Sequence, residues 1–451
     1  MRVLVIGLAV TGEAVVRHRL LAGDEVMVLE DRPGANPHWD DRARRAADAG
    51  VEVVASPSAE HSAALGAAAD LVVPSPGVPE RHPAIAGARR HGTPVRSEID
   101  LAADVRNGPA IVAVTGTNGK TTVTTLAAAM LGAAGLRATA AGNIGRPLID
   151  AVHDDVDVVV AEVSSFQLAF TERFAPRAAA LLNLGADHLD WHRTFDAYAR
   201  AKANVFLRQH PDDVLVFNAD DPVVAGLTAG APARRVPFSV ASGAAEGARL
   251  VDTVRGRLLV GPSGQELARV EELAGARPVD LANGLAASAL ALDLGATAEG
   301  VREALASFRG LPHRMQVVAD HDGICWVDDS KATNVHATLA AVGGLDHVVL
   351  LAGGRNKGLD LRDLRVLAPR LRAVVAIGDA AGEVEDAFDG VVPVVRASSM
   401  QRAVAAASEL ARRGDTVLLS PACASFDWYA SYGARGDDFA AEVRAIVEVQ
   451  R

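Results

Sequence analysis

Short apolar runs alternate with stretches of helical periodicity along most of the chain. Near the amino terminus the predicted strands are Arg2–Gly7, Glu25–Glu30, Val51–Ala55 and Leu71–Pro74, and the first helix is predicted at Glu13–Ala22. Strands that alternate with helices in this way are typical of an open, mostly parallel sheet. The pattern therefore predicts an α/β fold.

Three domains are expected from the length and from two breaks in the pattern. A chain of 451 residues is too long for one hydrophobic core, since domains of roughly 100–200 residues are usual. The pattern changes near residue 98 and restarts at Gly310–Arg314, so we predict domains at 1–98, 99–310 and 311–451. We expect Rossmann-like first and third domains around a central domain that carries a phosphate loop.

The most specific motif opens the second domain. A strand ending at Thr115 leads into Gly116, Thr117, Asn118, Gly119, Lys120, Thr121 and Thr122, and an alanine-rich helix follows. Backbone N–H groups at such a helix start face phosphate oxygens, the lysine adds a positive charge and the Thr121 hydroxyl suits Mg²⁺. An ordinary turn needs glycine but has no need of Lys-Thr beside it. The motif therefore predicts a nucleotide triphosphate site.

Two more polar segments follow strands of this domain. Strand Val156–Glu162 ends in a carboxylate, and a carboxylate beside a phosphate loop is a ligand that Mg²⁺ needs. The alternative is that Glu162 is an ordinary surface residue, as a lone Glu is in most proteins. The next cluster comprises Asn183, Asp187, His188, Asp190 and His192. Its density favours metal and anion ligands over a merely hydrogen-bonded loop. A helix is predicted at Thr194–Arg208, and it carries Lys202.

Weaker signals lie in the first domain. The turn from Gly7 to Gly12 resembles G-x-G-x-x-G, but Ala9 stands where a glycine usually lets pyrophosphate approach. Glu30 or Asp31 follows at nearly the spacing of a ribose-binding acid. Because the middle glycine is missing, a domain that binds another nucleotide is as good an interpretation as one that binds a dinucleotide. Ser75 lies on a loop that is either a ligand contact or a plain turn.

Three polar loops follow predicted strands of the third domain. The strands Cys325–Val327, His347–Leu351 and Thr416–Leu419 lead into the loops 328–334, 353–358 and 420–427. The carboxyl ends of parallel strands share one edge of a sheet, which is where open α/β folds bind ligands. A second binding site is expected there.

Charge and composition exclude several classes of function. The formal net charge is −11, which argues against nucleic acid as the main partner. Without a long uncharged apolar run or a basic leader at Met1, membrane spanning and export are not expected, and a cytoplasmic location is predicted. Cys325 and Cys423 lack disulfide or zinc spacing and are expected to be small buried hydrophobes.

Lysine usage is the most informative part of the composition. The chain has 41 arginines but four lysines, at Lys120, Lys202, Lys331 and Lys357. Lysine differs from arginine in being a compact charge whose amine can react. The simpler explanation is that four lysines remain at unrelated positions by chance, but each motif that contains one of these lysines weakens that explanation.

With these residues in view, the whole chain resembles the Mur ligase family, ATP-dependent amide-forming enzymes of cell-wall precursor synthesis. The resemblance rests on Gly116–Thr122, Asp187-His188, Gly310–Arg314 and Asp329–Asn334. Within the family, Ser164–Leu168 and Leu419–Ser425 are similar to the members that add D-glutamate. The resemblance implies that ATP phosphorylates the carboxylate of UDP-N-acetylmuramoyl-L-alanine, and that the amine of D-glutamate then attacks the acyl phosphate.

The resemblance also implies roles for matching residues. Lys120, Glu162, His188 and Lys202 are implied to be catalytic, and Thr121, Glu162, His188 and Lys202 to surround two Mg²⁺ ions, with Lys202 carbamylated. The ATP-binding set is Gly116, Thr117, Asn118, Gly119, Lys120, Thr121, Thr122, Asn283, Arg314, Asp329 and Lys331. The set for the UDP-linked substrate is Thr11, Asp31, Arg32, Ser75, Asn143, Gln167 and His188. D-glutamate is implied to contact Thr333, Lys357, Ser425 and Tyr432.

Some positions depart from the family pattern. Tyr432 stands where the pattern has Phe, and Val279-Asp280 replaces His-Asn before Asn283. An L-glutamate-adding relative, another Mur ligase or a folylpolyglutamate synthase would share the loop and the mechanism. A nucleotide-binding regulator would have no need of Lys202 and His188. A monomer that binds neither nucleic acid nor membrane is expected.

Overall fold

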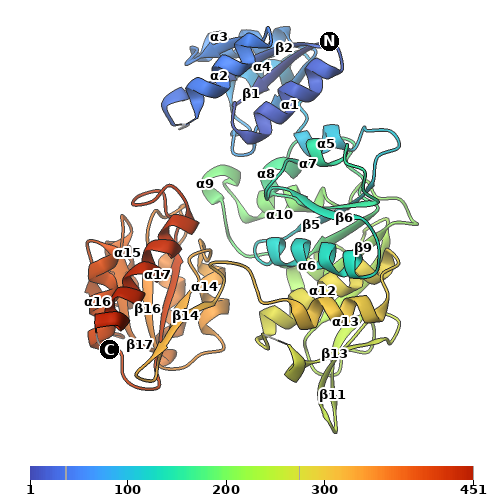
Figure 1. The fold of residues 1–451 in the computed structure, drawn as a ribbon. Helices are drawn as coiled ribbons and strands as arrows, with labels where there is room; N and C mark the ends of the chain where they lie inside the picture. Colours follow the sequence, from blue (N-terminus) through green and yellow to red (C-terminus); the bar gives the residue numbers. More distant parts are fainter. Residues whose placement is uncertain (36–37, 274, 450–451) are drawn as a thin grey trace. The chain divides into compact units, whose positions relative to one another are not determined.

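The computed structural model describes residues 1–35, 38–273 and 275–449. Within these residues the strands form three sheets, of four, nine and six strands, and helices flank the sheets (Figure 1). The predicted α/β class is confirmed. The chain divides into two compact units: Met1–Leu184, Asp196–Ala276 and Asp280–Phe308 form the first, and Gly185–Phe195, Arg277–Val279 and Arg309–Arg451 form the second.

The amino-terminal sheet is parallel throughout, with the strand order β3-β2-β1-β4. Its elements are β1 (Arg2–Ile6), α1 (Val10–Leu21), β2 (Glu25–Glu30), α2 (Trp39–Asp48), β3 (Glu52–Ala55), α3 (Ala59–Ala68), β4 (Leu71–Pro74) and α4 (Pro83–Arg90). The first helix begins three residues before the predicted start. Gly12 lets the first turn of this helix lie against the preceding loop, because a Cβ there would lie 2.0 Å from the Gly7 carbonyl oxygen.

Two glycines let helices α3 and α4 pack closely. A Cβ on Gly66 would lie 1.9 Å from the Ala84 carbonyl oxygen, and one on Gly87 would lie 2.1 Å from the Ala63 carbonyl oxygen. Each glycine therefore presses against the backbone of the other helix. No side chain larger than hydrogen fits at either position without moving a helix.

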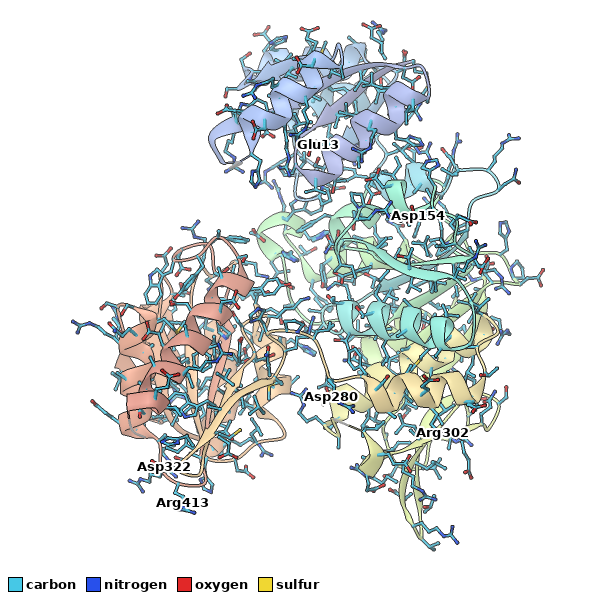
Figure 2. The ribbon with its side chains drawn as sticks, in the orientation of Figure 1. Glu13, Asp154, Asp280, Arg302, Asp322 and Arg413 are labelled. Carbon is cyan, nitrogen blue, oxygen red and sulfur yellow. The ribbon has the colours of Figure 1, made fainter. Side chains whose placement is uncertain are left out.

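The nine-stranded sheet has the order β13-β12-β11-β10-β9-β8-β5-β7-β6 and is parallel from β6 to β11. Its strands are β5 (Ala110–Thr115), β6 (Ala138–Gly142), β7 (Val158–Glu162), β8 (Ala178–Leu181), β9 (Val214–Asn218), β10 (Arg234–Ser239), β11 (Ala248–Thr253), β12 (Gly256–Val260) and β13 (Glu266–Arg269). Strand β13 lies at the edge, and its Glu266 and Leu267 carbonyls accept hydrogen bonds from Arg302, labelled in Figure 2.

Helical periodicity builds the core of this sheet. In α6 (Lys120–Ala133) the buried residues Val123, Leu126, Ala127, Met130 and Leu131 recur at helical spacing. They pack in one cluster with the strands and with α12 (Pro278–Asp293) and α13 (Ala298–Ser307). The remaining helices of the region are α5 (Glu98–Ala102), α7 (Leu148–Ala151), α8 (Ser165–Leu168), α9 (Leu189–His192), α10 (Phe195–Ala203) and α11 (Pro222–Leu227). The helix that opens at the phosphate loop is thus anchored in the core.

The predicted end of the helix Thr194–Arg208 is wrong. The observed α10 stops at Ala203, and the backbone then tightens into hydrogen bonds from Asn204 to Ala201 and from Val205 to Lys202. The Asn204 side chain donates to the Leu168 carbonyl oxygen at 2.9 Å. A polar side chain that bonds to backbone outside its own helix competes with helix continuation.

The sheet of the second unit has the order β14-β15-β19-β16-β17-β18, with β14 antiparallel to its neighbour. Its elements are β14 (Gln316–His321), β15 (Ile324–Asp328), α14 (Val335–Val342), β16 (Val348–Gly353), β17 (Leu371–Ile377), α15 (Ala381–Phe388), β18 (Val394–Arg396), α16 (Met400–Leu410), β19 (Thr416–Ala422) and α17 (Tyr432–Val449). In β16, Val348 and Leu350 belong to one apolar cluster, and Val349 and Leu351 belong to the other. This alternation buries both faces.

Among the described helices, none combines the length and the apolar character needed to cross a membrane.

We predict that Gly66→Ala lowers the melting temperature, because the added methyl group would overlap the Ala84 backbone. The matched control is Gly132→Ala in α6, where an added Cβ meets no atom within 4 Å. Alanine is the better helix former, so the control keeps or raises the melting temperature. Thermal unfolding followed by circular dichroism tests both. Equal melting temperatures for the two variants would contradict the close packing of α3 and α4.

Candidate functional site

The phosphate loop is closed by its own lysine in this structure. Gly119 caps α6 with a φ of +84°, a conformation that glycine adopts without strain. The Lys120 Nζ donates to the Gly116 and Thr117 carbonyl oxygens at 3.0 and 2.9 Å. The lysine therefore lies along the loop whose N–H groups are expected to meet phosphate.

Asn183, one of the polar cluster that the sequence favoured as metal and anion ligands, holds the same loop from the neighbouring strand. The Asn118 N–H donates to Asn183 Oδ1 at 2.8 Å, and Asn183 Nδ2 donates to the Asn118 carbonyl oxygen at 3.0 Å. The Thr117 N–H donates to the Asn183 carbonyl oxygen at 2.9 Å. Because β8 pairs with β5, the residue after β8 falls beside the loop after β5.

The predicted ATP residue Asn283 lies against the loop. It is buried on α12, and a Cβ on Gly119 would come 2.4 Å from its Oδ1 atom. A side chain at position 119 would therefore displace Asn283. The structure brings this residue to the phosphate loop across more than 160 residues of sequence.

Glu162 joins the end of β7 to two neighbouring elements. Its Oε2 accepts a hydrogen bond from the Thr121 hydroxyl at 2.7 Å, and its Oε1 accepts one from Asn143 Nδ2 at 3.0 Å. The side chain is 4% exposed. A buried carboxylate next to a threonine hydroxyl of a phosphate loop is the oxygen donor set that Mg²⁺ prefers.

Within the described residues, no three His, Cys, Asp or Glu side chains form a group that could hold a metal. Mg²⁺ is commonly bound by one or two carboxylates and by substrate phosphates, rather than by a complete protein cage. Thr121 and Glu162 fit that pattern.

Lys202 is almost fully buried, at 2% exposure, on helix α10. Its Nζ donates to the Gly116 carbonyl oxygen at 2.8 Å and to the Thr115 hydroxyl at 3.3 Å. It also lies 4.9 Å from the centre of the Tyr198 ring. The bland alanine-rich surroundings of Lys202 in the sequence gave no hint of these contacts.

Tyr198 is a further site residue that the sequence prediction missed. It is buried, and its hydroxyl lies 2.9 Å from the Thr117 hydroxyl. One turn of α10 separates Tyr198 from Lys202, so both face the loop. This i, i+4 spacing was the signal that could have identified it.

Gln167 is engaged at both ends of its amide. Its Oε1 accepts from the backbone and the hydroxyl of Ser164, and its Nε2 donates to Glu98 at 2.9 Å. Glu98 also accepts a hydrogen bond from the Ile149 N–H. Burial raises the pKa of the Glu98 carboxyl to about 7, although these two hydrogen bonds act in the opposite direction.

The predicted residues of the first sheet collect at the carboxyl ends of β1, β2 and β4. The Ser75 hydroxyl donates to the Gly7 carbonyl oxygen at 2.9 Å, and Thr11 lies in the first turn of α1. The Glu30 carboxylate accepts hydrogen bonds from the N–H groups of Leu8 and Arg32, so it is bonded to the backbone of the loops that follow β1 and β2.

Asp31 is held by a histidine instead. The His82 Nε2 lies 2.9 Å from Asp31 Oδ2, and His82 Nδ1 accepts a hydrogen bond from the Ala84 N–H. The Asp31 side chain remains about half exposed, at 48%. Of the two acids that the sequence left open, Asp31 is the more accessible.

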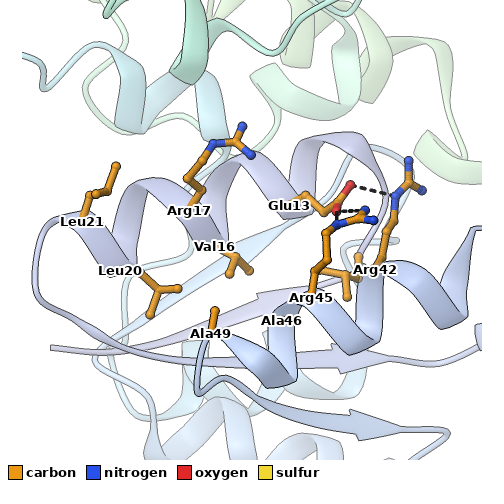
Figure 3. Close-up of a pocket in the computed structure, with 10 residues that line it drawn as sticks. Glu13, Val16, Arg17, Leu20, Leu21, Arg42, Arg45, Ala46 and Ala49 are labelled. Carbon is orange, nitrogen blue, oxygen red and sulfur yellow. Dashed lines mark hydrogen bonds and ion pairs between the residues drawn. The ribbon is translucent and has the colours of Figure 1, made fainter.

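A groove between α1 and α2 is separate from these residues (Figure 3). Glu13 pairs with Arg42 and Arg45 at one end, and Val16, Leu20 and other apolar side chains form its wall. None of Thr11, Asp31, Arg32 and Ser75 lines the part of the groove that the structure describes.

In the second unit, the order of the strands brings three predicted loops together. Strand β19 pairs with both β15 and β16, so the loops after these three strands are neighbours. Asp329 accepts from the Ser420 hydroxyl at 3.0 Å and from the Met315 N–H at 3.2 Å. Burial raises the pKa of the Asp329 carboxyl to about 7, and the nearby charge of Arg314 opposes that shift.

Lys357 contacts Asp187, an acid of the polar cluster that the sequence favoured as metal and anion ligands. Its Nζ donates to Asp187 Oδ1 at 2.7 Å, and Asn334 Nδ2 donates to Asp187 Oδ2 at 3.0 Å. Asp187 and His188 belong to the second unit, whereas Glu162 and Lys202 belong to the first. His188 has a φ of +53°, which marks a strained turn in a non-glycine residue.

The remaining predicted residues of this unit are Lys331, Thr333, Ser425 and Tyr432. The Lys331 Nζ lies 5.3 Å from the centre of the Tyr432 ring, and the ring is partly exposed. Ser425 is buried on the loop after β19, and Thr333 follows Lys331 by two residues.

We predict that the melting temperature of Glu98→Gln, relative to the unaltered protein, rises from about pH 5 to about pH 8. An acid with a raised pKa keeps its proton in the folded state while the unfolded chain releases it. Stability is therefore lost as the pH rises from the ordinary value towards about 7. Glutamine does not ionise, and Asp329 contributes equally to both proteins. A difference that is constant with pH, measured by thermal unfolding, would contradict the buried carboxyl.

Comparison with known proteins assigns each part of the chain. Residues 1–97 match the Mur ligase MurD-like N-terminal domain, 114–291 the Mur ligase middle domain, and 313–423 the Mur ligase glutamate ligase domain. Among solved structures, a pseudomurein peptide ligase type C from Methanothermus fervidus shares 18% identity, with a TM-score of 0.62 over 98% of this chain and 99% of that chain. At this identity the likeness shows the fold alone.

Curated relatives match over nearly the full length. UDP-N-acetylmuramoylalanine--D-glutamate ligase of Frankia casuarinae is 45% identical over 98% of this chain and 94% of its own. The enzyme of the same name from Thermobifida fusca is 41% identical over 99% of this chain and 98% of its own. The resemblance expected from the motifs is confirmed. The chain belongs to the Mur ligase family of ATP-dependent, Mg²⁺-using enzymes that form amide bonds.

Proposed function

We propose that this chain joins D-glutamate to UDP-N-acetylmuramoyl-L-alanine during the synthesis of peptidoglycan precursors. In the first step, the substrate carboxylate takes the γ-phosphoryl group of ATP, which gives an acyl phosphate and ADP. In the second, the amine of D-glutamate attacks the acyl carbon, phosphate leaves and a proton is released. The observation that carries the proposal is the match to D-glutamate ligases over 98% of the chain at 45% identity.

The phosphate loop is proposed to hold ATP. The N–H groups of Gly116 to Thr122 and the start of α6 would face the β- and γ-phosphates. Lys120 now donates to two carbonyls of its own loop, and these are bonds that phosphate oxygens can replace. A fixed ammonium group stabilises the charge that develops as the phosphoryl group is transferred.

Thr121 and Glu162 are proposed to hold one Mg²⁺ ion, and Glu162, His188 and Lys202 to surround a second. The ions would neutralise phosphate charge and let two anionic groups approach. The oxygen pair at Thr121 and Glu162 supports the first position. For the second position, the support is the chemistry of the residues and their match to the family.

Lys202 is proposed to carry a carbamate. An uncharged amine attacks CO₂ to give N–CO₂⁻ and a proton, which converts a cation into an oxygen ligand. Burial beside the loop and Tyr198 supports this role, because the Nζ lies 2.8 Å from the Gly116 carbonyl at the phosphate site.

The second unit is proposed to bind the amino acid and part of the nucleotide. Thr333, Lys357, Ser425 and Tyr432 would receive D-glutamate, and Arg314, Asp329 and Lys331 would contact ATP. Thr11, Asp31, Arg32, Ser75, Asn143, Gln167 and His188 are proposed for the UDP-linked substrate. The pairing of Lys357 with Asp187 supports an anion site, because a substrate carboxylate can replace that acid at the ammonium group.

We keep 1–98, 99–310 and 311–451 as the proposed domain limits. We also propose that the enzyme acts as a monomer in the cytoplasm, on small molecules rather than on nucleic acid or membrane.

The function is tested by phosphate release from ATP. We expect release with UDP-N-acetylmuramoyl-L-alanine and D-glutamate together, and background release when either is omitted. The panel contains L-glutamate, L-alanine, L-lysine and meso-diaminopimelate as alternative amines, and dihydrofolate as an alternative acceptor. Preference for another amine would replace the D-glutamate assignment. Release that ignores both substrates would remove the ligase assignment.

We predict that Lys202→Arg keeps the fold and abolishes ligation, because a guanidinium does not form the carbamate. The matched control is Arg200→Lys, an exposed position on the same helix, which is expected to keep full turnover. Carbon NMR in labelled bicarbonate should show a carbamate signal in the unaltered protein that is missing from Lys202→Arg. Near-native turnover of Lys202→Arg would refute the carbamate.

A further inference from the structure

Arg435 is a buried arginine whose hydrogen-bond partners are all uncharged. It lies in the first turn of α17 and is 1% exposed. Its Nε donates to the Ser330 hydroxyl at 2.9 Å, its Nη2 to the Ser330 carbonyl at 2.8 Å, and its Nη1 to the Cys423 carbonyl at 3.1 Å. Across the part of the chain that the structure describes, no carboxylate oxygen lies within 4 Å of its guanidinium nitrogens.

This arrangement differs from that of other shielded arginines in the chain. Arg96 pairs with Asp100, and Arg372 pairs with Asp415. Taking a cation out of water is costly, and neutral acceptors compensate only in part. For Arg435 the remaining compensation comes from Asp328 and Asp427, whose charges act on the guanidinium without contacting it. Burial lowers the pKa of Arg435 to about 10, so the group remains charged at neutral pH. The three hydrogen bonds alone do not require that charge.

The guanidinium lies beneath the loops proposed to bind the amino acid. Ser330 precedes Lys331 and Thr333 on the loop after β15, and Cys423 precedes Ser425 on the loop after β19. Tyr432 begins the same helix, and its carbonyl accepts from the Ser330 hydroxyl at 2.8 Å. On the third loop, a Cβ on Gly354 would lie 3.1 Å from Arg435 Nη1.

We propose that Arg435 is a positioning residue whose buried charge sets the affinity for the dicarboxylate amino acid. This inference rests on the proposed function. D-glutamate brings two carboxylates, whereas the Lys357 ammonium that is proposed to receive one of them already contacts Asp187. In a medium of low dielectric constant, a charge acts over several ångströms without touching the ligand. The carbonyls and the hydroxyl that Arg435 binds fix its distance from the loops.

The test compares Arg435→Gln and Arg435→Lys with the unaltered enzyme. D-glutamate is titrated at saturating ATP and UDP-N-acetylmuramoyl-L-alanine, and each of the other substrates is titrated in turn. We expect Arg435→Gln to raise the KM for D-glutamate about tenfold or more, and to leave the other two KM values within about twofold. Arg435→Lys keeps the positive charge but loses the planar guanidinium that donates to three acceptors, so its melting temperature falls. Its KM for D-glutamate is expected to stay within about threefold of that of the unaltered enzyme.

The matched control is Arg372→Lys. Arg372 pairs with Asp415 at the opposite, amino end of the same sheet, so its loss should lower the melting temperature without changing any KM. Melting temperatures are recorded for every variant. If Arg435→Gln does not fold, Arg435→Lys decides the question, because a purely structural role would raise its KM for D-glutamate well beyond threefold.

The two proposals fail in different ways. If the unaltered enzyme does not ligate D-glutamate, the proposed function and the role of Arg435 are both overturned. If it does, an unchanged KM for D-glutamate in Arg435→Gln overturns the role of Arg435 alone. Equal rises in all three KM values would also overturn it, since they would indicate general disorder of the unit.

Discussion

The geometry of the first unit depends on one backbone carbonyl. The Gly116 oxygen accepts hydrogen bonds from two ammonium groups, those of Lys120 and Lys202, which lie on different helices. Two positive charges so close together repel each other unless anionic groups lie nearby. In the unmodified chain the carbonyl thus holds two ammonium groups side by side at the phosphate loop, and the proposed carbamate on Lys202 would replace one of these positive charges with a negative one. Glu162 adds a negative charge next to them, through its bond to Thr121.

The motif residues of this unit could be predicted because each follows a strand. Glu162 and the phosphate loop come after apolar runs that the sequence displays plainly, and a parallel sheet brings such ends together. Tyr198 could not be recognised in the same way, and Asn183 was recognised as a candidate ligand but not as a hydrogen-bond partner of the phosphate loop. Their roles come from hydrogen bonds to the loop, which depend on how α10 and β8 lie beside β5. The end of α10 likewise coincides with a contact that local periodicity does not show, the hydrogen bond from Asn204 to the Leu168 carbonyl.

In the second unit, strand order was the information that the sequence lacked. Strand β19 comes last along the chain but lies between β15 and β16, which precede it by many residues. Only this insertion places Ser420 on Asp329 and Cys423 on Arg435. Asp187 illustrates the same limit, because it precedes α10 in sequence yet bonds to Lys357 and Asn334. Non-local pairings of this kind are not encoded in local periodicity.

The burial of the lysines has a practical consequence for chemical labelling. Lys202 is 2% exposed, the Lys357 side chain is 15% exposed and paired with Asp187, and Lys120 and Lys331 are both partly shielded. Amine-directed reagents are therefore expected to modify these four side chains slowly while the chain is folded and readily once it unfolds, so that lysine modification would report on unfolding.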